Sequence, residues 1–121
     1  MKPRVVITGV GAVCGAGRDP DAIFAAIAER RSAIAPIEGW DTSGWPVKHA
    51  AEIHDFNARA LVDDRKLHKL IRRTDMLGIY AGDRAAEAAG YAAHRDALPE
   101  SEAAQFSDRT GIYVGSGGGA F

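Results

Sequence analysis

The sequence predicts an α/β fold, in which strands and helices alternate along the chain. Two short runs of β-branched residues, 4–8 and 109–114, are each followed by glycine and have the composition of strands that are buried on both faces. Between them lie segments with helical spacing, of which 74–89 is the longest. Because strands separated by helices can pair in parallel, this order favours a parallel sheet.

Length and composition limit the organisation and the partners of the chain. Its 121 residues, 46% hydrophobic and 26% charged, predict one ordinary globular domain at most. Fifteen basic and 16 acidic side chains give a formal net charge of -1, which excludes a polyanion-binding face over the whole molecule. No apolar run approaches the roughly 20 residues of a membrane span. A single cysteine fits a reducing compartment. We therefore expect a cytoplasmic protein that binds neither nucleic acid nor a membrane.

A glycine-rich loop, 9–18, follows the first predicted strand. Its four glycines permit positive φ angles or the close approach of another segment. Asp19 and Pro20 predict the start of a helix, because aspartate caps a helix and proline fits its first position. We expect this helix to fray near 30–31. Its apolar face consists of Ile23, Phe24 and Ile27.

The central part of the chain predicts short elements. Prolines and glycines interrupt residues 32–57, so that we expect loops and short strands there, with an extended segment at 47–53. Residues 63–70 carry mixed charge and predict a short helix. Residues 90–108 have the composition of a polar connection.

The long helix predicted at 74–89 is rich in alanine and contains Gly78 and Gly82. Glycine is unfavourable within a helix, but small residues let a neighbouring backbone come close. We therefore expect this helix to be central and buried.

The glycine loop departs from the dinucleotide-binding pattern. The G-x-G-x-x-G fingerprint needs a third glycine where this chain has Cys14. The short-chain dehydrogenase variant also fails, because Gly15 and Gly17 come two residues late. A structural glycine turn is the favoured interpretation, and an NADP-dependent reductase is the less favoured one.

Other candidate chemistry is weak. Cys14 has no histidine near it in sequence, so that we expect a packing residue rather than a nucleophile. The carboxylates are scattered, and we predict neither a metal site nor a cofactor. The histidines lack metal-ligand spacing, and they are His49, His54, His68 and His94.

The densest charge cluster consists of Arg65, Lys66, His68, Lys69, Arg72 and Arg73. Two interpretations are open on charge alone. The cluster is either a solvated face or a docking patch for an acidic partner, since clustered Lys and Arg steer encounter and pair with carboxylates or phosphates.

Several motifs, at matching spacing along the whole chain, resemble the opening of the β-ketoacyl-[acyl carrier protein] synthases. The similarity is greatest to the type II synthases that elongate acyl chains. The motifs are Val5-Val6-Ile7-Thr8-Gly9-Val10-Gly11, Asp41-Thr42-Ser43, Ala51-Glu52-Ile53-His54-Asp55-Phe56-Asn57, Arg72-Arg73-Thr74-Asp75 and Gly111-Ile112-Tyr113-Val114-Gly115-Ser116-Gly117.

The resemblance implies a thiolase-like fold with αβαβα layers, of which this chain is the first part of the N-terminal half. It implies an acyltransferase that condenses an acyl thioester with malonyl-acyl carrier protein as CO2 leaves. The family uses a cysteine nucleophile and two histidines, and we expect none of these catalytic residues within 1–121. Cys14 takes a serine or threonine position of the family. We expect residues 1–121 to be an N-terminal portion that ends within the loop Gly115–Phe121, leaves apolar surface uncovered and is inactive alone.

The resemblance also assigns two sites. The basic residues just before the long helix contact acyl carrier protein in the type II synthases, and they correspond to Lys69, Arg72 and Arg73. We predict that charge reversal at Arg72 and Arg73 weakens carrier-protein binding, most strongly at low salt. The second site is the acyl-pocket loop of Gly115, Ser116, Gly117 and Gly118.

Individual departures from the family refine these expectations. Gly118 replaces an isoleucine that borders the acyl pocket, and the added space predicts acceptance of longer or stiffer acyl chains. Arg30 replaces the usual helix-ending glycine, and Phe24 replaces a tryptophan. The complete protein is expected to be a homodimer. The alternative is a non-catalytic chain-length factor, which forms a heterodimer with an active synthase.

Overall fold

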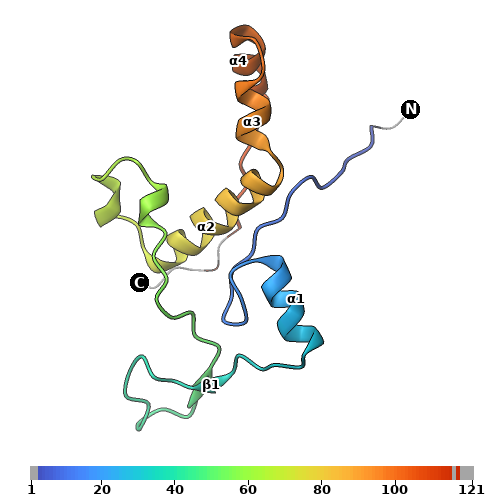
Figure 1. The fold of residues 1–121 in the computed structure, drawn as a ribbon. Coiled ribbons are helices and arrows are strands. Elements are labelled where there is room, and N and C mark those ends of the chain that lie inside the picture. Colours follow the sequence, from blue (N-terminus) through green and yellow to red (C-terminus); the bar gives the residue numbers. More distant parts are fainter. Residues whose placement is uncertain (1–2, 116, 118–121) are drawn as a thin grey trace.

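Helix α2 (Arg73–Ala88) is the longest element of the computed structural model, which describes residues 3–115 and 117 (Figure 1). The helix was predicted at 74–89, and the structure confirms it with a shift of one residue. Asp75 lies in its first turn and accepts a hydrogen bond from the backbone N–H of Arg72 at 2.8 Å, which caps the helix. The core cluster of Phe56, Ala58 and Met76 lies at this end of α2.

The glycine loop packs against the alanine face of α2. A Cβ atom on Gly11 would lie 2.0 Å from the carbonyl oxygen of Ala81, and one on Gly9 would lie 2.3 Å from that of Ala85. The close approach predicted for the loop glycines is therefore confirmed. The same prediction is wrong for the glycines of the helix, because a Cβ on Gly78 or Gly82 would meet no atom within 4 Å. Alanines, not glycines, form the contact face of the helix.

Helix α1 (Pro20–Ala28) begins where the sequence predicted. Asp19 Oδ1 accepts a hydrogen bond from the N–H of Ala22 at 2.7 Å, and Pro20 occupies the first helical position. At the other end, the N–H of Arg30 donates to Ile27 and the N–H of Arg31 to Ala26, which closes a Schellman motif. Arg30 has a φ of 54°, so that the left-handed position usually filled by glycine holds an arginine.

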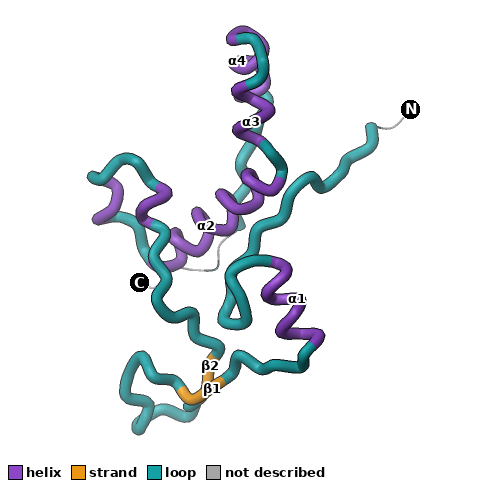
Figure 2. The backbone as a smooth tube through the Cα atoms, viewed as in Figure 1, coloured by secondary structure: helices purple, strands orange, loops and turns teal. Residues whose placement is uncertain are grey.

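The only strand ladder among residues 3–115 is a short antiparallel hairpin (Figure 2). β1 (Ala35–Pro36) pairs with β2 (His49–Ala50) in the register Ala35 to Ala50 and Pro36 to His49. In the loop between them, the rings of Trp40 and Trp45 pack edge to face with centroids 5.3 Å apart.

The predicted strands 4–8 and 109–114 are not strands in the structure, and the parallel sheet expected from them is therefore absent from the described part of the chain. Both segments are exposed: Val5 is 91% and Ile112 is 88% accessible. A strand exists only where a neighbour satisfies its backbone groups, and neither segment has such a neighbour within the described residues. The expectation that apolar surface stays uncovered is confirmed.

Two helices replace the polar connection predicted at 90–108, and that prediction was wrong. α3 (Tyr91–Asp96) follows Gly90, whose φ of 66° ends α2, and α4 (Glu100–Asp108) follows Pro99. They extend away from the β1–β2 hairpin, at the opposite end of the molecule (Figure 1). The Phe106 ring lies 5.2 Å from that of Tyr91 and 5.1 Å from that of His94, measured between centroids, and these contacts join the two helices.

Candidate functional site

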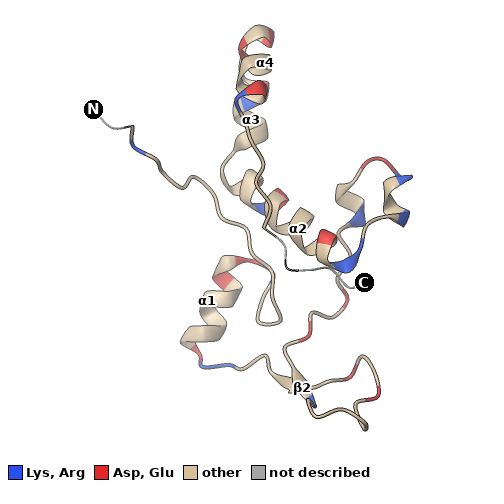
Figure 3. Ribbon diagram, turned by 180° about the vertical axis from the view of Figure 1, so that it is seen from behind, with Lys and Arg blue, Asp and Glu red and all other residues tan. Residues whose placement is uncertain are grey.

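The charge cluster of the sequence lies in a segment that we call the basic loop, residues 59–73. It contains two 3-10 turns, η1 (Arg59–Leu61) and η2 (Leu67–Lys69), and it leads into α2. The helix predicted over 63–70 is reduced to the three residues of η2, because Asp64 Oδ1 bonds the N–H of Lys66 at 2.9 Å and favours a turn. Figure 3 shows that Lys and Arg gather in this loop and at the adjoining start of α2.

Side-chain contacts with the backbone hold the basic loop in place. Arg59 donates two hydrogen bonds, from Nε to the carbonyl of His68 and from Nη2 to that of Ile71, each at 3.2 Å. His68 Nε2 contacts the carbonyl oxygen of Val62 at 2.7 Å, so that this histidine has a structural contact within the loop. Arg59 was missed by the sequence reasoning, because its partners are backbone carbonyls 9 and 12 residues away, which no side-chain pattern reveals.

The structure brings the three predicted docking residues together at the end of the basic loop. Lys69 ends η2, Arg72 precedes α2 and Arg73 is its first residue, and all three are exposed. A guanidinium nitrogen of Arg73 donates to the carbonyl of Ile53, so that Arg73 also ties the helix to the preceding segment. Leu70, between these cations, is 72% exposed.

The predicted acyl-pocket loop is described only in part. Gly115 and Gly117 are exposed. Ser116 and Gly118 lie outside the described residues.

The glycine loop uses its glycines for packing. Because Gly9 and Gly11 press directly on the backbone of α2, their close approach serves a helix contact rather than a pyrophosphate. Cys14 pairs with Gly17 through two backbone hydrogen bonds of 2.9 and 3.2 Å, and its side chain is exposed. The expectation that Cys14 is a buried packing residue was therefore wrong.

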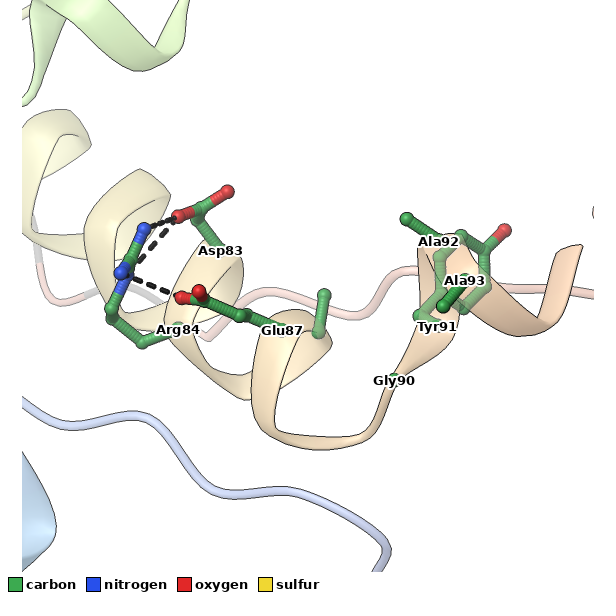
Figure 4. A pocket seen from close by; sticks show the side chains of 8 residues that line it. Asp83, Arg84, Glu87, Gly90, Tyr91, Ala92 and Ala93 are labelled. Carbon is green, nitrogen blue, oxygen red and sulfur yellow. Dashed lines mark hydrogen bonds and ion pairs between the residues drawn. The ribbon is translucent and has the colours of Figure 1, made fainter. Parts of the chain in front are cut away.

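A concavity between α2 and α3 involves none of the predicted site residues (Figure 4). Its one arginine, Arg84, contacts Asp83 at 2.5 Å and Glu87 at 2.6 Å. The hydrogen bond to Asp83 raises the pKa of Arg84 above its ordinary value. Both carboxylates neutralise this guanidinium, and small alanines form much of the remaining wall, so that the concavity offers little to a charged ligand.

Within residues 3–115 and 117, no group of three or more His, Cys, Asp and Glu side chains is arranged to hold a metal ion. None of the helices described in this chain combines the length and the apolar character needed to cross a membrane.

Comparison with known proteins identifies the family. Residues 2–121 match the family described as "Beta-ketoacyl synthase, N-terminal domain". The chain belongs to this family. Relatives include the chloroplastic 3-oxoacyl-[acyl-carrier-protein] synthase I of Hordeum vulgare, 33% identical over 121 residues, which cover 98% of this chain and 24% of that protein. The membership confirms the resemblance read from the sequence.

Two bacterial relatives match nearly the whole of this chain. The 3-oxoacyl-[acyl-carrier-protein] synthase 2 of Coxiella burnetii is 32% identical over 96% of this chain and 26% of its own length. Nodulation protein E of Rhizobium meliloti is 35% identical over 95% of this chain and 27% of its own length. The chain thus spans about a quarter of the length of these relatives.

Proposed function

We propose that this chain is part of a β-ketoacyl-acyl carrier protein synthase, and that the basic loop docks the carrier protein. The observation that carries the proposal is the exposed group of Lys69, Arg72 and Arg73 at the start of α2, in a chain that belongs to the synthase family. The names of two relatives state that they act with an acyl carrier protein. A carrier protein with an acidic surface complements these cations.

In the proposed reaction, malonyl-carrier protein loses its carboxylate as CO2, and the carbon that keeps the electron pair attacks the carbonyl carbon of an enzyme-bound acyl thioester. The thiolate of the enzyme leaves, and a β-ketoacyl thioester remains on the carrier protein. The nucleophile and its histidines belong to parts of the synthase outside 1–121. We extend the proposal to the αβαβα layering, to a cytoplasmic homodimer, and to fatty acid or polyketide assembly as the pathway.

Charge reversal tests the docking. In the complete protein, Lys69→Glu and Arg72→Glu should each raise the Kd for acyl carrier protein about 10-fold at low salt, because each replaces an attraction by a repulsion. The loss should shrink as added salt screens the charges. Reversal at Arg73 should also weaken binding, but it removes the hydrogen bond to Ile53 as well and is therefore harder to interpret.

Arg31→Glu is the matched control, because Arg31 is exposed and lies in another region, beside Glu29. Its Kd should change little. Unchanged affinity of the Lys69 and Arg72 variants in a titration at low salt would contradict the docking proposal.

An activity assay separates the two synthase-like alternatives. The complete protein should convert acyl- and malonyl-carrier protein to a β-ketoacyl product that is detectable by mass spectrometry. Product that forms only after an active synthase subunit is added would instead support the chain-length factor. Binding of NADPH, followed by fluorescence, would support the reductase.

The acyl-pocket loop gives a further test of the proposal. Gly118 stands where the family carries an isoleucine beside the acyl chain, so that Gly118→Ile in the complete protein should shorten the products. An unaltered product profile would contradict the assignment of this loop.

A further inference from the structure

We propose that Arg59 is a positioning residue for carrier-protein docking. It holds the backbone of the basic loop in the shape that presents Lys69 and Arg72 to the partner. The inference rests on the proposed function and deepens it, because Arg59 is half-buried, binds the backbone next to the docking residues and acts through them.

The two carbonyls that Arg59 binds lie directly before the docking residues Lys69 and Arg72 in the chain. The carbonyl of His68 belongs to the residue before Lys69, and the carbonyl of Ile71 to the residue before Arg72. One planar guanidinium thus fixes the peptide groups that lead into two of the three docking residues, Lys69 and Arg72. A lysine ammonium carries the same charge but lacks the rigid pair of donors, so that it cannot hold both carbonyls in the same way.

The backbone that carries Arg59 is anchored next to the core. Ala58, the residue before Arg59, is 3% exposed and packs with Phe56 and Met76. The N–H of Arg59 donates to Asn57 Oδ1 at 3.0 Å, which fixes the start of η1. Met76 belongs to the first turn of α2, so that the core next to Arg59 includes the helix that begins with Arg73.

The contact of His68 with Val62 makes a second tie in the opposite direction across the loop. Together Arg59 and His68 hold the backbone of the loop at three carbonyls, those of Val62, His68 and Ile71. A loop that is ordered before the partner arrives loses less conformational freedom on binding. The contacts of Arg59 and His68 therefore lengthen the lifetime of the complex, while the positive charge of the loop raises the rate of encounter.

Arg59→Lys in the complete protein isolates this effect, because it keeps the charge and breaks the fork. We expect about a 10-fold rise in the dissociation rate of acyl carrier protein, with little change in the association rate and in its salt dependence. The KM for an acyl chain on the carrier protein should rise relative to the KM for the same acyl chain on free pantetheine. The ratio of the two KM values cancels any change at the acyl site that affects both substrates alike.

Arg95→Lys is the matched control, because Arg95 lies on α3, away from the loop, and forms an ion pair with Asp96. It should leave the ratio of KM values unchanged. Arg59→Gln should raise the dissociation rate of acyl carrier protein as well, because glutamine has a single amide donor group. It also removes the charge, so that the association rate of the carrier protein should fall.

A double-mutant cycle between Arg59→Lys and Lys69→Glu completes the test. If Arg59 acts by presenting Lys69, the effect of Arg59→Lys should shrink in the Lys69→Glu background. Two results would overturn the role of Arg59 and leave the docking function standing. One is full additivity of the two substitutions. The other is an unchanged KM ratio for Arg59→Lys when Lys69→Glu does weaken carrier-protein binding. Unchanged binding by Lys69→Glu would overturn the docking function and the role of Arg59 with it.

Discussion

The N-terminal stretch divides after Thr8 into two segments with opposite surroundings. Residues 3–8 carry β-branched side chains, and Val5 and Ile7 are 91% and 85% exposed. Residues 9–17 are rich in glycine, and within them Gly9 and Gly11 lie so close to α2 that neither position leaves room for a Cβ atom. The apolar segment is therefore the exposed one, which reverses the usual preference of these residue types.

The difference lies in where each segment finds its partners. The glycine segment needs only a smooth helical surface, which Ala81 and Ala85 provide within this chain. A buried strand needs hydrogen-bonding neighbours at its edges and side chains over both faces. The described residues supply neither to 4–8, and we expect the rest of the synthase to do so.

The largest effect should come from placing a charge in the exposed strand segment. In the complete protein, Ile7→Asp should destabilise the fold by more than about 3 kcal/mol, because the carboxylate would be buried without a partner. Denaturant unfolding of the purified protein measures this loss. The isolated 121-residue chain is the control, since Ile7 is 85% exposed there and the same substitution should leave its unfolding curve unchanged. An equal loss in both proteins would contradict the comparison.

Matched alanine substitutions test the glycine segment. Gly11→Ala should cost about 1–3 kcal/mol, because its Cβ would collide with the backbone of α2. Gly78→Ala should stabilise the protein by about 0.5–1 kcal/mol, since its Cβ meets open space and alanine favours the helix. Urea denaturation of the two variants should therefore give changes of opposite sign. The same sign for both would show that the contact with α2 is not tight.

The end of α1 contrasts with Gly11, because glycine would suit the backbone conformation there but the chain has an arginine. Arg30→Gly should stabilise the protein by about 0.5–1 kcal/mol, because it relieves the left-handed φ of 54°. Thermal unfolding with Arg31→Gly as control measures the gain, since Arg31 does not share the positive φ. A gain from Arg31→Gly as well would show that the removal of charge, not of strain, is responsible.

The loop between β1 and β2 is exposed yet carries its own polar partners, and it should show the smallest effect. Asp41 accepts hydrogen bonds from the N–H and the hydroxyl of Ser43 at 2.9 and 3.0 Å. The backbone hydrogen bond, and then the hydroxyl, lower the pKa of Asp41 below its ordinary value of 3.8. The turn is therefore stabilised above pH 3.8 and loses this support as the pH falls through the lowered pKa. The amide NMR shift of Ser43 should follow this titration, and Asp41→Asn should abolish it.

Sequence reasoning succeeded where the interactions are local. Asp19 and Pro20 fixed the start of α1, and the spacing of α2 located it within one residue. The two strand predictions were wrong because the pairing of a strand depends on distant segments. Helices α3 and α4 were missed because they are short and have little periodicity. Contacts between rings, such as that of Tyr91 with Phe106, stabilise them.

The candidate site divides in the same way. The docking role of Lys69, Arg72 and Arg73 stays a prediction, which the family resemblance supplies from a motif that is contiguous in the chain. Arg59 was not predicted, because its role depends on the backbone path of the loop that it closes. Periodicity and charge patterns contain no information about which carbonyls will converge on one guanidinium.

The pair of Trp40 and Trp45 has a spectroscopic consequence. They are the two tryptophans of the chain, and both lie between β1 and β2. All its indole fluorescence, and any exciton coupling of the two rings in circular dichroism, therefore reports on that hairpin loop and not on the basic loop. Leu70→Trp would place a third indole among the cations of the basic loop and give the proposed partner-binding surface a signal of its own.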